Sequence, residues 1–189
     1  MAPNSPNLRI HILGASGSGT TTLGRGLADE LGRPHLDSDS FFWLPTVPAF
    51  QTVRRKEERQ RLLSEALGAS PLWVLSGSLC GWGDPFIQHF DLVVFLWIPH
   101  ELRMHRLHER EIARYGPAAI EPGGSRHDAY QAFMTWAAAY DEGDITMRSR
   151  RQHEAWFQQI PCRVLRLEGD KTIPQLLAAV HAAIQDRPA

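Results

Sequence analysis

The chain has 189 residues, 43% of them hydrophobic, which suits one domain with a substantial core and is too short for two ordinary domains. Its net charge of −1 gives no overall field that would attract nucleic acid or a membrane surface. The two cysteines, Cys80 and Cys162, form no CxxC pair, and the N-terminal segment lacks the basic and apolar regions of a signal peptide. We therefore expect a cytoplasmic protein, monomeric or homodimeric, that binds neither nucleic acid nor membrane.

The first half of the chain alternates short apolar runs with amphipathic segments. Leu23, Leu27 and Leu31 recur every four residues, which predicts one face of a helix that ends at Gly32. By the same criteria the sequence predicts strands over 8–13, 34–37 and 72–75, and helices over 20–31 and 52–67.

The second half continues this alternation. The run 91–98 is continuously apolar, which predicts a central strand covered on both faces. Helices are expected over 101–115, 127–140, 145–160 and 172–184, with a strand over 163–167. The order predicts an α/β domain over 1–189, a three-layer α/β/α fold with a mostly parallel five-stranded sheet. The Gly/Pro-rich stretch 116–125 and its flanks predict a helical lid insertion at approximately 111–150.

A glycine-rich loop lies between the first predicted strand and the first predicted helix. It follows the phosphate-loop pattern GxxxxGK[ST] at all positions except one, and consists of Gly14, Ala15, Ser16, Gly17, Ser18, Gly19, Thr20 and Thr21. Glycines allow tight turning, so successive backbone N–H groups can face a phosphate at a helix N-terminus. Thr21 is the expected Mg²⁺ ligand. The alternative is a glycine-rich turn that serves packing alone.

Thr20 stands where the pattern has lysine. That lysine contacts the β- and γ-phosphates as a point charge, whereas threonine donates one hydrogen bond and carries no charge. The loop is still expected to hold phosphate through its backbone.

The loop GASGSGTTT resembles the phosphate loops of uridine and gluconate kinases, apart from Thr20. The chain is similar in element order, over nearly its whole length, to nucleoside, nucleotide and small-molecule kinases of the P-loop class. The resemblance implies a P-loop kinase fold, ATP or ADP with Mg²⁺, and a small-molecule acceptor.

Two carboxylates follow the second predicted strand. Asp37-Ser38-Asp39 is similar to the DxD of shikimate kinases, and the resemblance implies that Asp39 is the base for the acceptor hydroxyl. It implies that Asp37 binds metal or substrate. The alternative for Asp39 is a local turn cap.

Arginines recur along the helix expected over 101–115. Arg103, Arg106, Arg110 and Arg114 are spaced by three, four and four residues, and a second cluster is Arg148, Arg150 and Arg151. The resemblance places both groups around a lid, where arginines clamp phosphoryl oxygens. We interpret Arg106, Arg110 and one of the pair Arg148 and Arg151 as functional, and Arg103 and Arg114 as part of a solvated face.

After the last predicted strand, Gly169 and Asp170 are implied by the same resemblance to back the adenine ring. Together these features favour an ATP-dependent kinase of a small hydroxylated or phosphorylated acceptor. Thr20 keeps open a second interpretation, a non-catalytic nucleotide-binding module or sensor.

Overall fold

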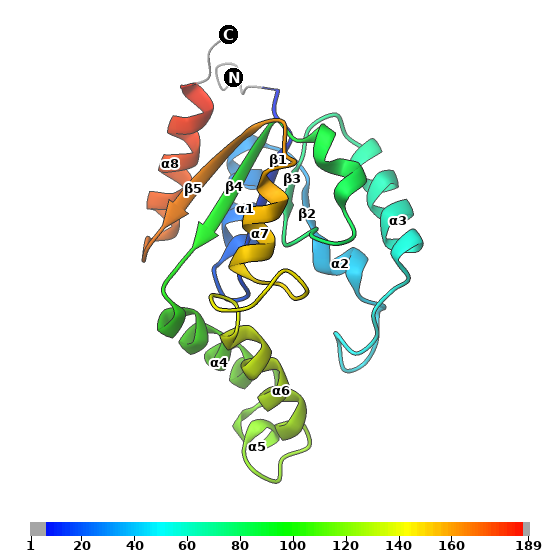
Figure 1. Ribbon diagram of the computed structural model, residues 1–189, viewed down its shortest axis with the longest axis vertical. Helices are drawn as coiled ribbons and strands as arrows, with labels where there is room; N and C mark the ends of the chain where they lie inside the picture. The colour runs from blue at the N-terminus through cyan, green and yellow to red at the C-terminus, as the bar shows by residue number, and fades with distance from the viewer. Residues whose placement is uncertain (1–6, 187–189) are drawn as a thin grey trace.

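The computed structural model describes residues 7–186, which contain one five-stranded sheet between helices (Figure 1). The strands are β1 (Ile10–Gly14), β2 (His35–Asp37), β3 (Val74–Ser76), β4 (Leu92–Trp97) and β5 (Arg163–Glu168). Their order in the sheet is β2-β3-β1-β4-β5, and all pairs are parallel. The three-layer parallel fold expected from the sequence is confirmed. Parallel strands bring their carboxyl ends to one edge, so the segments after β1, β2 and β5 meet there.

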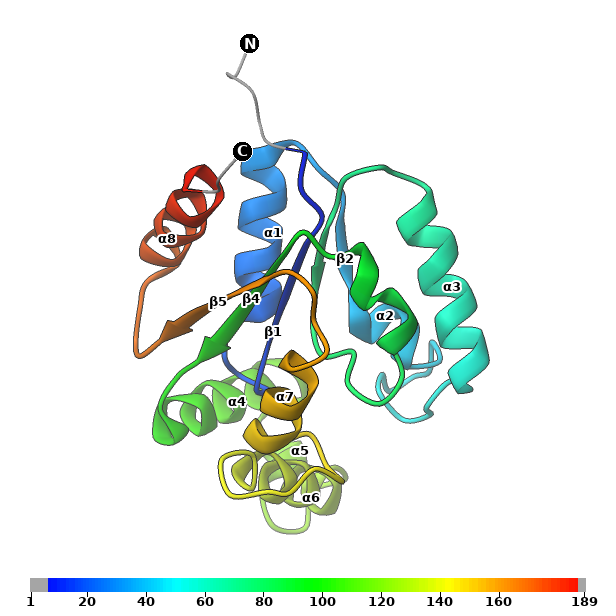
Figure 2. The ribbon, with the colours of Figure 1, turned by 45° about the horizontal axis from the view of Figure 1, so that its top comes forward.

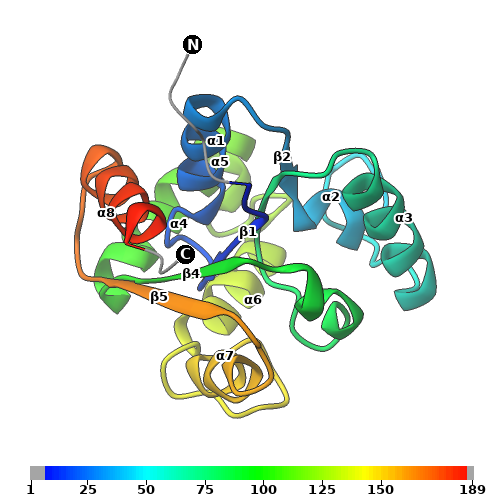
Figure 3. The ribbon, with the colours of Figure 1, turned by 90° about the horizontal axis from the view of Figure 1, so that it is seen from above.

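Helices cover both faces of the sheet, as seen from two further directions in Figures 2 and 3. On one face lie α1 (Thr20–Leu31) and α8 (Ile173–Gln185); on the other lie α3 (Lys56–Gly68), the 3₁₀ helix η1 (Asp84–His89) and α7 (Arg150–Phe157). Alternate residues of a strand serve the two layers, because side chains alternate across a sheet. In β4, Val94 packs toward α1 and α8, whereas Val93 and Phe95 pack toward α3 and α7.

The remaining helices lie at the carboxyl edge of the sheet. Figure 1 shows α4 (His100–Tyr115), α5 (Pro117–Ile120) and α6 (His127–Ala138) extending beyond this edge, in the region where the sequence predicts a lid. The short helix α2 (Ser38–Phe42) follows β2. These elements surround the space in front of the glycine loop.

Some element boundaries differ from the sequence predictions. The helix expected from residue 52 begins at Lys56, because Val53 forms an antiparallel bridge with Trp43 that keeps this segment extended. The helix expected from residue 145 begins at Arg150, because the Ser149 side chain accepts a hydrogen bond from the backbone N–H of Gln152 and caps the helix there. The short helices α2, α5 and η1 were not predicted.

None of the helices in residues 7–186 combines the length and hydrophobicity that crossing a bilayer requires. The same residues contain no group of three or more histidine, cysteine, aspartate or glutamate side chains arranged to hold a metal ion.

Two histidines are fully buried on the α3–α7 face. His153 has its Nε2 3.2 Å from Ser78 Oγ and its Nδ1 2.8 Å from the Tyr140 hydroxyl. The His11 ring stacks on Phe90, with 4.8 Å between ring centroids. Burial lowers the pKa of each imidazole to about 3, so both are neutral in the folded protein.

The burial of these two neutral histidines leads us to expect that the folded protein loses stability in acid. Because their pKa values in the folded state lie below the ordinary 6.5, the unfolded chain binds more protons between pH 6.5 and pH 3. The free energy of unfolding should therefore fall as pH decreases through this window, by up to about 1.4 kcal/mol per pH unit for each histidine. Urea unfolding at pH 7 and pH 5 measures this, and His11→Leu should reduce the pH dependence. An exposed-histidine control, His105→Gln, should not; equal pH dependence in the parent and His11→Leu would contradict the assignment.

Candidate functional site

The glycine loop is held against two neighbouring elements at points without room for a side chain. A Cβ on Gly14 would lie 2.4 Å from the backbone oxygen of Leu96 in β4. A Cβ on Gly17, where φ is +83°, would lie 2.9 Å from the backbone oxygen of Arg103 and from Leu107 Cγ in α4. Gly14 and Gly17 therefore fix the loop to the sheet and to α4.

Gly19 has a different role, because a Cβ there would meet no described atom within 4 Å. Its φ of +95° places the N-cap of α1 in the left-handed region, and no side chain caps this helix end. The first N–H groups of α1 are therefore free to bind an anion. Ser18 Oγ is also buried in the loop without a hydrogen-bond partner among the described residues. An anionic ligand would satisfy these donors.

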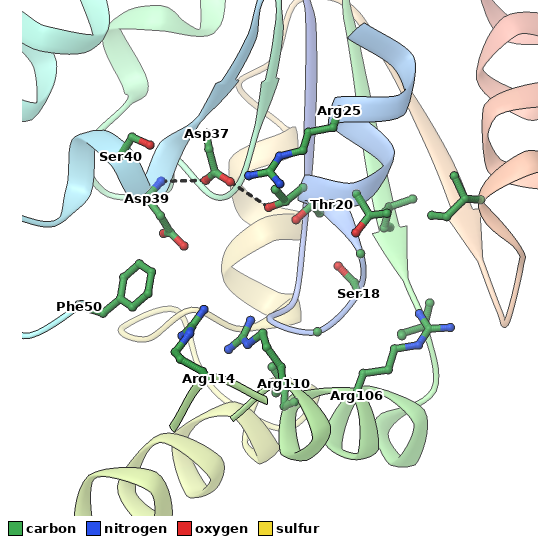
Figure 4. A pocket seen from close by; sticks show the side chains of 18 of the residues that line it. Ser18, Thr20, Arg25, Asp37, Asp39, Ser40, Phe50, Arg106, Arg110 and Arg114 are labelled. Atoms are coloured by element: carbon green, nitrogen blue, oxygen red, sulfur yellow. Dashed lines mark hydrogen bonds between the residues drawn. The ribbon is translucent and has the colours of Figure 1, made fainter. Parts of the chain in front are cut away.

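The carboxylate of Asp37 connects the loop to the end of β2 (Figure 4). Its Oδ2 accepts a hydrogen bond of 3.0 Å from the Thr21 hydroxyl, and its Oδ1 accepts one of 3.0 Å from the backbone N–H of Asp39. The second bond caps α2 and fixes the carboxylate orientation. Two oxygens on one octahedral Mg²⁺ at 2.0–2.1 Å lie roughly 2.9 Å apart, so Thr21 and Asp37 fit as ligands of this ion.

Asp39 points into the space between α2 and α4, where Arg110 and Arg114 project toward it (Figure 4). Solvent still reaches the side chain, but the surrounding protein displaces part of its water, which disfavours the charged carboxylate and raises the pKa of Asp39. The negative charge of Asp37 acts in the same direction. The positive charges of Arg148 and Arg110 oppose this rise. A carboxylate with a raised pKa that is held among arginines is suited to accept a proton.

A cavity of about 1060 Å³ extends along this edge of the sheet, and we call it the loop cavity. Its wall includes the loop residues 17–21, both carboxylates, the segment after β5 that contains Gly169, and Arg106, Arg110 and Arg114 of α4. The tertiary structure therefore brings together the loop, the carboxylates and the β5–α8 segment that the sequence analysis proposed as one site.

The predicted arginines divide into separate positions. Arg106 pairs with Asp170 at 3.2 Å, and in Figure 4 it points away from Asp39. Arg110 pairs with Glu111 at 3.3 Å and lines the cavity near Asp39. Arg151 is exposed on α7 and lines neither of the two cavities described here.

The interpretation of Arg103 as part of a solvated face is wrong. Its side chain is fully buried and donates hydrogen bonds of 2.7 Å to Asp141 Oδ2 and 3.2 Å to the backbone oxygen of Ala137. Asp141 Oδ1 also accepts a bond from Trp97 Nε1 at 2.9 Å. Arg103 therefore fastens α4 to the chain after α6 and to the end of β4.

Sequence reasoning also missed Arg25 and the segment before α3. Arg25 lies one turn after Thr21 on α1, and its guanidinium lies beside Asp37 (Figure 4). The spacing of four residues was a usable signal, because helical side chains tilt toward the N-terminus and so toward the loop. Phe50 lines the cavity from the segment between α2 and α3, and no motif marks it.

A second cavity of about 510 Å³ adjoins the first, and Asp39 and Arg110 line both. It lies between α2, the segment before α3, and helices α4 and α6; we call it the aromatic cavity. A donor held by the loop and a molecule in the aromatic cavity would meet at Asp39.

Comparison with known proteins identifies proteins that are similar in sequence to this chain. No protein-family model matches the chain. YqaC of Bacillus subtilis, an uncharacterized protein, is 45% identical over 164 residues, which cover 87% of this chain and 90% of YqaC. The chain belongs to the same family as YqaC. The shikimate kinase of Acinetobacter baumannii strain AYE is 33% identical over 107 residues, which cover 51% of this chain and 59% of that enzyme.

Solved structures support the fold assignment. Shikimate kinase from Acinetobacter baumannii in complex with shikimate has a TM-score of 0.58 at 19% identity, covering 94% of this chain and 93% of that one. A gluconokinase from Sinorhizobium meliloti 1021 has a TM-score of 0.55 at 15% identity, covering 95% and 92% of the two chains. The chain therefore has the P-loop kinase fold of shikimate kinase and gluconokinase.

The geometry of the loop predicts that Gly14 and Gly19 respond differently to substitution. Gly19→Val should abolish ADP binding, because the new side chain strains a backbone at φ +95° and projects into the cavity. Gly14→Ala should instead lower the melting temperature, because its Cβ would clash with β4. Calorimetric titration with ADP and Mg²⁺, together with thermal unfolding, measures both effects. Undiminished ADP affinity in folded Gly19→Val would contradict this role of the loop.

Proposed function

We propose that the protein is a P-loop kinase that transfers the γ-phosphate of ATP to a small hydroxylated or phosphorylated acceptor. The observation that carries the proposal is the position of Asp39 at the boundary of the loop cavity and the aromatic cavity. A phosphate donor and an acceptor bound in these two spaces would have their reacting ends at one carboxylate. The shared fold with shikimate kinase and gluconokinase agrees with this proposal.

The donor end of the site is built from backbone and oxygen ligands. The loop N–H groups at Gly14–Thr21 are proposed to hold the phosphates of ATP or ADP, and Thr21 and Asp37 to hold Mg²⁺. Mg²⁺ neutralises charge on the phosphates. The segment at Gly169 and Asp170 is proposed to contact the adenine ring, with Arg106 beside it.

The acceptor end is built from Asp39 and the arginines around it. Asp39 is proposed to take the proton from an acceptor hydroxyl, and its raised pKa makes it a better base than an ordinary aspartate. Arg110 and Arg148 are proposed to face the transferred phosphoryl group, because both act electrostatically on Asp39. Residues 111–150 are proposed to act as a lid that excludes water during transfer.

A second candidate function is favoured by Thr20. Without the lysine charge the protein could bind ATP or ADP and report occupancy through the lid without transferring phosphate. Loss of one preorganised charge from such a site costs roughly 10²–10³ in rate, which leaves a slow enzyme rather than an inactive one. The two carboxylates beside the loop favour the kinase.

Substitution of the two aspartates tests the proposed kinase activity. Asp39→Asn should lower turnover strongly and leave ATP affinity nearly unchanged, because the amide cannot accept the proton. Asp37→Asn, its matched control on the same turn, should instead increase the Mg²⁺ concentration needed for binding ATP. Initial rates across an acceptor panel and Mg²⁺ titrations measure these effects.

In the parent, loss of activity on acidification should begin above the pH expected for an ordinary aspartate, because the pKa of Asp39 is raised. Equal turnover in Asp39→Asn and parent would remove Asp39 from the mechanism.

Restoring the lysine tests which cation replaces its charge. If an arginine compensates for Thr20, Thr20→Lys should make ATP binding depend less on that arginine. Glutamine substitutions in the parent and in Thr20→Lys give the double-mutant comparison for Arg25, Arg106, Arg110, Arg148 and Arg151. We expect the largest coupling at Arg25, which lies beside Asp37, or at Arg110 or Arg148, whose charges act on Asp39. None is expected for the surface control Arg61→Gln on α3.

Equal ATP binding in Thr20→Lys and parent, with no dependence on any of the five arginines, would contradict charge replacement by them. The non-catalytic interpretation would then be favoured over the kinase.

A further inference from the structure

The aromatic cavity contains most of the large apolar side chains that the fold leaves exposed. Of the five described residues in this group, Phe50, Val53 and Trp136 line it, with exposed fractions of 37%, 46% and 37%. Its aromatic rings come from α2 and the segment that follows it, from α4 and from α6, and include Phe42, Tyr115 and Phe133. Exposed apolar surface gathered in a concave site is typical of a ligand-binding position.

The charges in this cavity are unbalanced. The two carboxylates of Asp39 and Glu111 face four arginines, which leaves an excess of two positive charges. The arginines are Arg110, Arg114, Arg126 and Arg148. Glu111 is buried and pairs with Arg110 at 3.3 Å and Arg114 at 3.5 Å. For Arg126 and Arg148 no carboxylate lies within ion-pair distance among residues 7–186.

Two of these arginines lie over aromatic rings. The Arg148 guanidinium carbon lies 5.7 Å from the centre of the Trp136 ring, and that of Arg126 lies 4.8 Å from the Tyr115 ring. Arg126 Nε is buried and has no hydrogen-bond partner in the described chain. Guanidinium groups bind phosphate through paired hydrogen bonds, and aromatic rings stack on planar ring systems.

We propose that the aromatic cavity binds a phosphomonoester joined to a planar ring system, the chemistry of a nucleoside monophosphate. A phosphomonoester carries close to two negative charges at neutral pH, which matches the excess of two arginines. The volume of about 510 Å³ falls within the range of small-ligand sites. This inference rests on the proposed function in identifying the occupant with the acceptor, whose sugar hydroxyl groups would then be the ones that Asp39 can deprotonate. A non-aromatic monocarboxylate such as shikimate would leave both the rings and part of the charge unmatched.

The test separates the two parts of the ligand. With ADP and Mg²⁺ saturating the loop, calorimetry measures binding of the four common ribonucleoside monophosphates, their nucleosides, ribose 5-phosphate and shikimate. We expect at least one monophosphate to bind about tenfold or more tightly than its nucleoside, ribose 5-phosphate and shikimate, because only the monophosphate engages both arginines and rings.

Two variants assign the parts to residues. Trp136→Ala should weaken the monophosphate about tenfold and leave ribose 5-phosphate unchanged. Arg148→Gln should weaken the monophosphate and ribose 5-phosphate and leave the nucleoside unchanged. The matched controls Ile145→Ala and Arg61→Gln, which are exposed and line neither cavity, should change none of these affinities. If Trp136→Ala does not fold, as judged by circular dichroism, Trp136→Leu keeps the apolar packing without the ring.

Binding of shikimate or ribose 5-phosphate as tightly as the best monophosphate would overturn the proposal, as would unchanged monophosphate affinity in both folded variants. Tight, variant-sensitive binding of a monophosphate without phosphate transfer would support this ligand class and contradict the kinase. ATP-dependent phosphorylation of shikimate, with no monophosphate binding, would contradict the ligand class and leave the kinase standing.

Discussion

The arrangement of the site depends on the close packing of the glycine loop against β4 and α4. Gly14 lies so near the Leu96 backbone that a Cβ would approach its oxygen to 2.4 Å, and Gly17 lies similarly close to the Arg103 backbone. Because these contacts are between backbones, they leave little freedom for the loop to move relative to either element. The anion-binding end of α1 and the arginines on α4 therefore share one rigid frame, and the distance from Gly19 to Asp39 is set by the sheet rather than by loop flexibility.

The same frame explains why neighbouring arginines on α4 have unrelated roles. Arg103 is buried at the base of the helix, where Asp141 joins it to Trp97 and so to the end of β4. One and two turns later, Arg106 and Arg110 lie along the loop cavity, toward the β5–α8 segment and toward Asp39 respectively. Anchoring the first arginine in the core positions the other two. In this arrangement, substitution of Arg103 affects stability, through loss of a fully buried side chain and of its bonds to Asp141 and Ala137, before it affects any ligand.

The two cavities are lined by different chemical groups and therefore suit different ligands. The loop cavity offers backbone N–H groups, a helix N-terminus and the oxygens of Thr21 and Asp37, which suit phosphate and a hard cation. The aromatic cavity offers rings and guanidinium groups, which suit a planar anion. Thr20 carries no charge, and basic side chains line both spaces, with Arg110 and Arg114 at their boundary. The positive charge around this site lies on side chains outside the glycine loop, which include Arg25 on α1, Arg110 on α4 and Arg148 before α7.

Features that depend on local chain properties could be predicted from the sequence. The bounds of α1 follow from Gly19, the leucine spacing and Gly32, and the structure has them at the predicted residues. The position of Asp37 and Asp39 beside the loop follows from parallel topology, because every strand ends at the same edge. Only the tertiary structure decided the burial of Arg103, the reach of Arg25 toward Asp37, and the convergence of Phe50, Tyr115 and Trp136 on one cavity. Each of these depends on contacts between residues many positions apart, which residue type and spacing do not encode. An arginine on a helix has the same sequence signature whether its partner is water, a buried aspartate or a ligand.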